Sequence, residues 1–146
     1  MKIALFFNNL RGLEVYKTLK KNFTVDIYLS QKNLNKKLLT YFRNEKIIII
    51  KKINSTIIKN IKKKNYYLLI TAGWPLIFPK ELFLSSLNGT INLHAGRVPK
   101  YRGGSPLNWQ IINNEKKIGI SVLKMTTKLD AGPIYTSKTF DLKKKI

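Results

Sequence analysis

The sequence contains no cysteine, and this absence excludes several classes of protein at once. A chain without cysteine has no disulfide scaffold, no thiolate-ligated zinc or iron–sulfur site and no cysteine nucleophile. The chain also has a single histidine, His94, which argues against a histidine-rich metal site. We therefore expect no metal.

Long apolar runs are missing as well. No stretch approaches the roughly 18–20 residues that a membrane span needs. The first residues, MKIALFF, break at Asn8 and Asn9 and precede no small-residue cleavage site, which indicates a first strand rather than a secretory signal. With 146 residues, 44% of them hydrophobic, the chain can bury one core. We expect a soluble, cytoplasmic, single-domain protein over residues 1–146 that does not bind a membrane.

Acidic residues are scarce, with 7 Asp and Glu against 28 Lys and Arg, so the formal net charge is +21. A field of that sign attracts polyanions and phosphorylated substrates. Only four of these basic residues are arginines. Arginine is the side chain that forms bidentate hydrogen bonds with phosphates and bases in nucleic-acid-binding proteins. Because lysine is enriched together with isoleucine and asparagine, we favour a composition bias over a dedicated nucleic-acid surface.

Strand and helix patterns alternate along the first half of the chain. The run 47–50 is entirely isoleucine and indicates a strand that is buried on both faces. The alternation implies an open, doubly wound, mostly parallel α/β sheet with helices on both faces. We expect strands at 2–7, 24–29, 47–50, 67–72, 90–93, 118–124 and 134–139, and helices at 12–21, 34–43, 55–63, 79–86 and 106–113.

The last residues, FDLKKKI, suggest a turn into a further helix that the sequence does not contain. We therefore expect a domain that lacks its last helix, that is, a C-terminally truncated fold. The lysine runs 62–64 and 143–145 are expected to be solvated ends.

No Gly-x-Gly-x-x-Gly fingerprint or P-loop occurs, so chemistry is sought elsewhere. Asn92 and His94 are two residues apart at the end of an expected strand, a spacing that points both side chains to one side. Ligands of open α/β sheets bind at such strand ends. The alternative is a capping asparagine beside a half-buried turn histidine. The long Gly- and Pro-rich loop that follows favours a functional role.

The loop carries Arg97 and Arg102, which are better candidates for anion contacts than any lysine run. Asp130 stands in the sequence LDAGP, which is typical of a turn. It is either a turn aspartate that bonds its own backbone, or a carboxylate near His94. In the second case it would stabilise the charged imidazole and could accept a proton.

Residues 91–135 resemble the core of the folate-dependent formyltransferases. This family includes methionyl-tRNA formyltransferase, glycinamide ribonucleotide transformylase and the sugar N-formyltransferases, enzymes of one-carbon metabolism. Its motifs are Asn-x-His, Pro-x-Tyr-Arg-Gly, a proline before an apolar helix, a Gly-x-Ser/Thr strand and Leu/Ile-Asp-x-Gly-Pro-Ile. They are matched in order by Asn92, His94, Pro99, Tyr101, Arg102, Gly103, Pro106, Gly119, Asp130, Gly132, Pro133 and Ile134.

The resemblance implies a Rossmann-like fold and the transfer of a formyl group from 10-formyltetrahydrofolate to a primary amine, without a metal. It assigns catalytic roles to Asn92, His94 and Asp130. Asn92 and protonated His94 would donate to the oxyanion of the attacked formyl group, each such donor contributing roughly 3–4 kcal/mol. Asp130 would keep His94 charged and relay the amine proton.

The resemblance also implies the binding residues. The folate stretch corresponds to residues 72–78, where backbone groups hold the pterin and apolar side chains line the pocket, with residues 128–130 on its other side. The expected folate-binding residues are Ala72, Gly73, Trp74, Leu76, Ile77, Lys128 and Leu129. The expected acceptor-binding residues are Arg97, Tyr101, Arg102 and Gly103.

The departures from the family pattern leave three functions open. Gly96 stands where many relatives have serine, and the long basic loop and C-terminal domain usual in methionyl-tRNA formyltransferases are absent. We favour an amino sugar or another small or nucleotide-linked amine as the acceptor. The alternatives are a methionyl-tRNA formyltransferase-like enzyme that acts on charged initiator tRNA, and an inactive folate-binding fragment. The intact Asn92, His94 and Asp130 argue against the last. The sequence does not indicate an oligomeric state.

Overall fold

The computed structural model describes residues 1–142, and the chain divides into two compact units, Met1–Ile91 and Asn92–Ile146. The further helix suggested by the C-terminal residues and the lysine run 143–145 lie outside the described residues. Among the described residues, no helix has the length and apolar character to cross a membrane.

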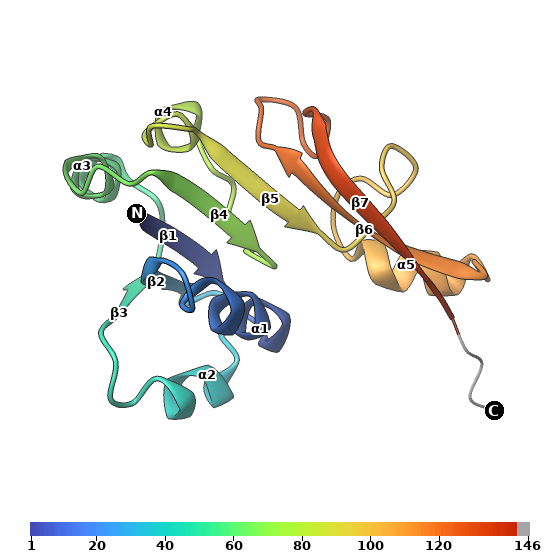
Figure 1. Ribbon diagram of the computed structural model, residues 1–146, viewed down its shortest axis with the longest axis horizontal. Coiled ribbons are helices and arrows are strands. Elements are labelled where there is room, and N and C mark those ends of the chain that lie inside the picture. Colours follow the sequence, from blue (N-terminus) through green and yellow to red (C-terminus); the bar gives the residue numbers. More distant parts are fainter. Residues whose placement is uncertain (143–146) are drawn as a thin grey trace. The chain divides into compact units, whose positions relative to one another are not determined.

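The first unit is built on four parallel strands in the order β3-β2-β1-β4 (Figure 1). The alternation of strands and helices predicted from the sequence is confirmed. The strands are β1 (Lys2–Phe7), β2 (Thr24–Ser30), β3 (Ile47–Ile50) and β4 (Leu68–Ala72), and the helices are α1 (Leu10–Leu19), α2 (Lys36–Tyr41), α3 (Ser55–Lys63) and α4 (Lys80–Phe83).

The strand order explains which face each helix covers. The chain moves outward from β1 through α1 and α2 to β3 and then returns to β4 through α3. Since parallel crossovers are right-handed, this reversal places α3 on the face opposite to α1 and α2. Figure 1 shows α1 and α2 on the lower side of these strands and α3 on the upper side.

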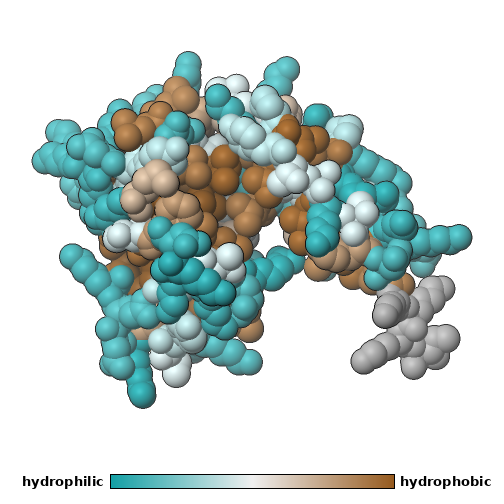
Figure 2. All heavy atoms as spheres, in the orientation of Figure 1, coloured by the Kyte–Doolittle hydropathy of each residue, from teal (hydrophilic) through white to brown (hydrophobic). Residues whose placement is uncertain are grey.

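Two adjacent phenylalanines of β1 anchor the core on the two faces of the sheet. Phe7 packs edge-on against Phe42, 6.0 Å between ring centroids, on the side of α1 and α2. Phe6 stacks on Tyr28 at 4.5 Å and meets Phe78 edge-on at 4.9 Å. Neighbouring side chains of a strand point to opposite faces, so the two rings lie on different sides of the sheet. Both are fully buried. Figure 2 shows apolar residues over these strands and hydrophilic side chains around them.

Asparagines set the starts of three helices. The side chains of Asn9, Asn35 and Asn54 accept hydrogen bonds from the backbone N–H groups of Gly12, Lys37 and Ile57, at 2.9–3.0 Å. The cap at Asn9 makes α1 begin at Leu10, two residues earlier than predicted. The cap at Asn35 makes α2 begin later than the predicted residue 34.

The prediction that strand 47–50 is buried on both faces is wrong. Ile50 is 1% exposed, whereas Ile49 is 48% exposed. In the first unit β3 is the last strand in the order and pairs with β2 alone. A run of β-branched residues favours a strand without fixing its place in the sheet.

The second unit consists of the end of β5 (Thr90–His94), helix α5 (Pro106–Ile112) and strands β6 (Lys117–Lys124) and β7 (Ile134–Asp141). Pro106 occupies the first turn of α5, as expected from its missing N–H. β6 and β7 pair antiparallel, with a register shift at Val122 and Leu123. All eight residues of β7 are exposed.

Candidate active site

Asn92 and His94 lie at the end of β5, two residues apart and therefore on the same face of the strand. The His94 side chain is 6% exposed, and Asn92 is partly buried. The amide and the imidazole thus reach one side of the second unit together, as the spacing predicted.

Asp130 joins them from the turn between β6 and β7. Its carboxylate Oδ1 accepts a hydrogen bond from Asn92 Nδ2 at 2.9 Å, and its Oδ2 lies 3.4 Å from His94 Nδ1. The same Oδ2 accepts the backbone N–H of Gly103 at 2.9 Å. Of the two sequence interpretations, the structure therefore shows a carboxylate beside His94.

The backbone of Asp130 has a φ of +46°, in the left-handed region that only a few residue types adopt easily. Aspartate tolerates this conformation, and it aims the carboxylate away from its own turn. The side chain is 6% exposed, so water screens its charge little. Strained backbone of this kind is held where the surrounding contacts over-determine it, as the contacts to Asn92 and Gly103 do here.

The imidazole is fixed from its other nitrogen by the loop. His94 Nε2 lies 2.5 Å from the backbone carbonyl of Tyr101, and because a carbonyl only accepts, Nε2 carries the hydrogen. When Nδ1 is also protonated, it donates toward Asp130 Oδ2. The ring is thus held in one orientation between a carbonyl and a carboxylate.

The loop that supplies Tyr101 and Gly103 is held by buried polar contacts. The Gln110 side chain is fully buried; its Nε2 donates to the carbonyl of Ala95 at 3.1 Å, and its Oε1 accepts from the Gly119 N–H at 2.8 Å. Ser121 Oγ donates to the carbonyl of Gly96 at 2.8 Å. Sequence reasoning missed both residues, although a glutamine within the apolar stretch LNWQII was a signal.

Glu115 is another residue of the site that sequence reasoning missed. It lies 2.5 Å from Arg97 Nη2 and 2.6 Å from Lys100 Nζ, and it accepts the Tyr101 hydroxyl at 2.5 Å. Hydrogen bonds from Lys100 and Tyr101, together with the Arg97 guanidinium, lower the pKa of Glu115 to about 2. The carboxylate thus stays charged at any ordinary pH and ties loop residues 97–101 to the segment after α5.

The four predicted acceptor-binding residues divide into two kinds. Arg97 pairs with Glu115, and Tyr101 is buried beneath the loop. Arg102 is exposed and donates from Nε to the Asp130 carbonyl at 3.1 Å, next to the Gly103 contact. Arg102 and Gly103 are therefore the two that lie directly beside the Asp130 turn.

The predicted folate-binding residues lie in both units. In the first, Ala72 ends β4 and is buried, and Gly73 has a φ of +66° with an added Cβ only 2.0 Å from Asn9 Nδ2, so glycine alone fits there. Trp74 Nε1 is buried without a hydrogen-bond partner among the described residues. Leu76 is half-buried, and Ile77 is 88% exposed.

In the second unit, Lys128 is exposed and Leu129 is 70% exposed. Both precede Asp130 in the β6–β7 turn, where the Thr126 hydroxyl donates to the Lys128 carbonyl at 3.1 Å. Among the described residues, no group of three or more His, Cys, Asp or Glu side chains is placed to hold a metal ion.

Fold and cluster together define an α/β domain in which Asn92, His94 and Asp130 lie in contact at the end of a strand. The family model described as formyl transferase matches residues 15–145. The chain belongs to that family, as the resemblance indicated.

Individual relatives agree with this assignment. Over 88 residues, 60% of this chain, the sequence is 36% identical to a methionyl-tRNA formyltransferase of Caldanaerobacter subterraneus. A 4-N formyltransferase from Francisella tularensis is 26% identical with a TM-score of 0.78, covering 97% of this chain and 57% of that one. A phosphoribosylglycinamide formyltransferase from Anaplasma phagocytophilum has a TM-score of 0.83 over the whole of this chain and 74% of its own, at 15% identity.

These structures confirm the predicted fold class, an open α/β sheet of the formyltransferase type. The match with the Caldanaerobacter enzyme spans 28% of that protein's length.

Proposed function

We propose that this chain transfers a formyl group from 10-formyltetrahydrofolate to a primary amine, with Asn92, His94 and Asp130 as its catalytic residues. The observation that carries the proposal is the placement of all three around one carboxylate, with Asn92 Nδ2 at 2.9 Å and His94 Nδ1 at 3.4 Å from its oxygens. Family membership supports formyl transfer, and these contacts support the roles of the residues.

The three side chains divide the work. Asn92 and protonated His94 donate to the oxygen that becomes negative when an amine attacks the formyl carbon. Since Nε2 of His94 bonds the Tyr101 carbonyl, it exchanges that partner for the substrate oxygen when substrate binds. Asp130 stabilises the imidazolium through Nδ1 and accepts the proton that the amine releases.

Two stretches have the properties that a folate needs. The buried Trp74 indole N–H has no acceptor among the described residues, and a pterin ring offers carbonyl and nitrogen acceptors. In the first unit Ile77 is apolar and 88% exposed, and in the second unit Leu129 is apolar and 70% exposed, so each offers surface that an apolar ring can cover. The folate supplies the activated formyl group, and we assign it to Ala72, Gly73, Trp74, Leu76, Ile77, Lys128 and Leu129.

For the acceptor, methionyl-tRNA is the first candidate. Relatives named methionyl-tRNA formyltransferase are 33–46% identical to the chain over 72–88 residues. A nucleotide-linked amino sugar is the second candidate, because the structure of a sugar N-formyltransferase from Shewanella is 26% identical over 97% of the chain. Arg102 and Gly103, beside the Asp130 turn, are the residues we assign to the acceptor's approach.

The test is a turnover assay with 10-formyltetrahydrofolate and three acceptors: methionyl-tRNA, a nucleotide-linked 4-amino sugar and glycinamide ribonucleotide. Formylated product with one acceptor supports the proposal and names the substrate. Calorimetry with a non-reactive folate analogue is run in parallel. Folate binding without any product identifies the inactive, folate-binding alternative, and the absence of both contradicts the proposal.

A further inference from the structure

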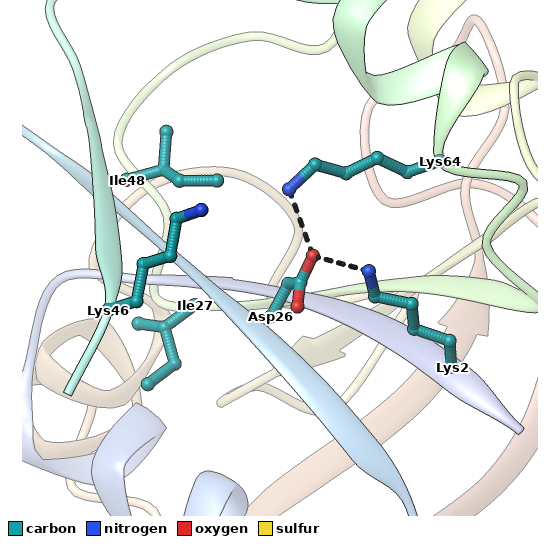
Figure 3. A pocket seen from close by; sticks show the side chains of 6 residues that line it. All are labelled: Lys2, Asp26, Ile27, Lys46, Ile48 and Lys64. Carbon is teal, nitrogen blue, oxygen red and sulfur yellow. Dashed lines mark hydrogen bonds and ion pairs between the residues drawn. The ribbon is translucent and has the colours of Figure 1, made fainter.

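Three lysines of the first unit converge on one small hollow. The hollow has a volume of about 250 Å³ and is lined by Lys2, Asp26, Ile27, Lys46, Ile48 and Lys64. Lys2 begins β1, Lys46 precedes β3 and Lys64 caps the end of α3. Figure 3 shows the ammonium groups of Lys2 and Lys64 turned toward Asp26 from separate elements, with Lys46 apart from them on the side of Ile48.

Asp26 offsets only part of this charge. Its Oδ2 lies 3.1 Å from Lys2 Nζ and 3.0 Å from Lys64 Nζ, and it also accepts the Tyr66 hydroxyl. Burial works to raise the pKa of Asp26, but hydrogen bonds from Tyr66, Lys64 and Lys2 outweigh it and leave the pKa below its ordinary value. The carboxylate is therefore ionised at neutral pH, and its three lysines leave an excess of two positive charges.

Lys46 is the lysine that Asp26 does not hold. It has no ion pair among the described residues, and its side chain lines the same hollow. Lys2 and Lys64 each have a further partner besides Asp26, since Lys2 Nζ lies 5.5 Å from the centre of the Tyr66 ring and Lys64 Nζ lies 5.7 Å from that of Tyr28. The hollow thus combines two ammonium groups that pair with Asp26 and one that is available to a ligand.

A second, mostly apolar hollow adjoins the first. Its volume is about 390 Å³, and it shares Ile48 and Lys64 with the charged hollow. The remaining lining residues are Tyr28, Ile57, Asn60, Ile61 and Lys63. Isoleucines from α3 and β3 thus form an apolar surface that leads directly to the lysines.

We propose that the two hollows form one binding site for a phosphate monoester carried on an apolar group. The charged hollow has an excess of two positive charges, and Lys63 of the apolar hollow adds a third. A phosphate monoester carries between 1.5 and 2 negative charges at neutral pH, by analogy with phosphorylated side chains, and therefore offsets more of this charge than a singly charged carboxylate does. The apolar body of the ligand covers Ile48 and Ile57, which are both half-buried. None of the lining residues belongs to the candidate active site.

Phenyl phosphate is the probe, because it joins a phosphate to a compact apolar ring. We expect calorimetry to show that phenyl phosphate binds more tightly than inorganic phosphate, and that phenol binds more weakly than both. Lys46→Gln should lower the affinity for phenyl phosphate about fivefold, which corresponds to the upper range for an exposed ion pair. The matched control is Lys59→Gln, which removes the same charge from an exposed position of α3 that lines neither hollow and should leave the affinity unchanged.

A third variant tests the apolar part, and a second measurement locates the ligand. Ile57→Ala should lower the affinity for phenyl phosphate and leave the affinity for inorganic phosphate unchanged. Amide NMR shifts on titration should centre on Asp26, Lys46 and Lys64. Equal weakening by Lys46→Gln and Lys59→Gln would show that overall charge alone attracts phosphate. That result, shifts centred elsewhere, or no binding at millimolar phenyl phosphate overturns the proposal.

Discussion

Asp130 accepts hydrogen bonds on both carboxylate oxygens, and this determines what its replacement by asparagine does. An amide accepts at one position only, so Asp130→Asn loses either the contact to Asn92 or the contact to Gly103. We expect a stability loss of about 1 kcal/mol, the ordinary value of one hydrogen bond. Removal of the charge that faces His94 should lower the formyl-transfer rate by about 10²–10⁴-fold. Thermal melts and steady-state kinetics measure the two effects separately.

The affinity for a non-reactive folate analogue is the control for Asp130→Asn and should stay within a few-fold. His94→Asn should cost about as much activity, and the double variant should not cost the sum, because residues that act as a unit are not additive. If Asp130→Asn turned over formyl groups nearly as fast as the parent, Asp130 would serve only to position the turn. The catalytic contribution would then come from Asn92 and His94 alone.

At the scale of elements, the β6–β7 connection has no room for a side chain at Gly132. An added Cβ there would lie 1.9 Å from the carbonyl oxygen of Lys124, a backbone atom of β6 that cannot rotate away. Gly132→Ala must therefore shift the turn that carries Asp130, at a cost of about 1–3 kcal/mol. The matched control is Gly104→Ala, whose Cβ meets nothing within 4 Å. Urea denaturation of both variants checks this, and equal stabilities would contradict it.

The loop after β5 depends on the charge of Glu115, so its contribution to stability should depend on pH. The pKa of Glu115 falls from an ordinary 4.5 to about 2 in the folded chain. A lowered carboxyl pKa stabilises the fold above pH 4.5, and this stabilisation is lost as the pH falls from 4.5 toward 2. The difference in melting temperature between the parent and Glu115→Gln should thus be full at pH 6 and shrink below pH 4.5.

Glu14→Gln serves as the control for that experiment, because Glu14 is exposed and, within residues 1–142, forms an ion pair with Lys17 of its own helix alone. We expect it to change the melting temperature little at either pH. A parent-to-variant difference at Glu115 that is the same at pH 6 and pH 3 would show that the side chain acts through its shape and not its charge.

Most strands were predictable because their patterns are local. β1 and β3 have the predicted bounds, and the other strands differ from prediction by one or two residues at an end. The helix starts were harder, since they depend on which asparagine caps, and Asn9 stands among other polar residues. The exposure of Ile49 could not be predicted, because the place of β3 in the strand order is not encoded in its own residues.

The residues of the candidate site that belong to a sequence motif were predictable. The residues that reach the site through packing were not. Asn92, His94 and Asp130 follow from the motif, and the structure brings them together. The roles of Gln110 and Glu115 depend on contacts with residues that are not adjacent to them in the sequence. The glutamine in the apolar stretch LNWQII signals a buried polar role, but the sequence does not show which groups it contacts.

At the scale of the whole molecule, the net charge of +21 sets the long-range electrostatics. Twenty-eight basic side chains repel one another in the folded chain and relax apart on unfolding, so the charge destabilises the compact state. Salt shortens the range of this repulsion to about 3 Å at 1 M. The local ion pairs at Asp26 and Glu115 respond in the opposite sense, but seven acidic residues cannot balance the basic excess. The melting temperature should therefore rise with sodium chloride.

The measurement is a series of thermal melts in sodium chloride from about 0.01 M to about 1 M, the range over which the screening length falls from roughly 30 Å to 3 Å. Lys21→Gln combined with Lys52→Gln removes two exposed charges that have no ion pair among the described residues, and it should reduce the slope. Chloride is used because sulfate stabilises proteins by exclusion from their surface, whatever their charge. A melting temperature that falls with chloride would mean that the ion pairs at Asp26 and Glu115 outweigh the repulsion. In that case the repulsion among the exposed lysines would contribute less to the melting temperature than the ion pairs do.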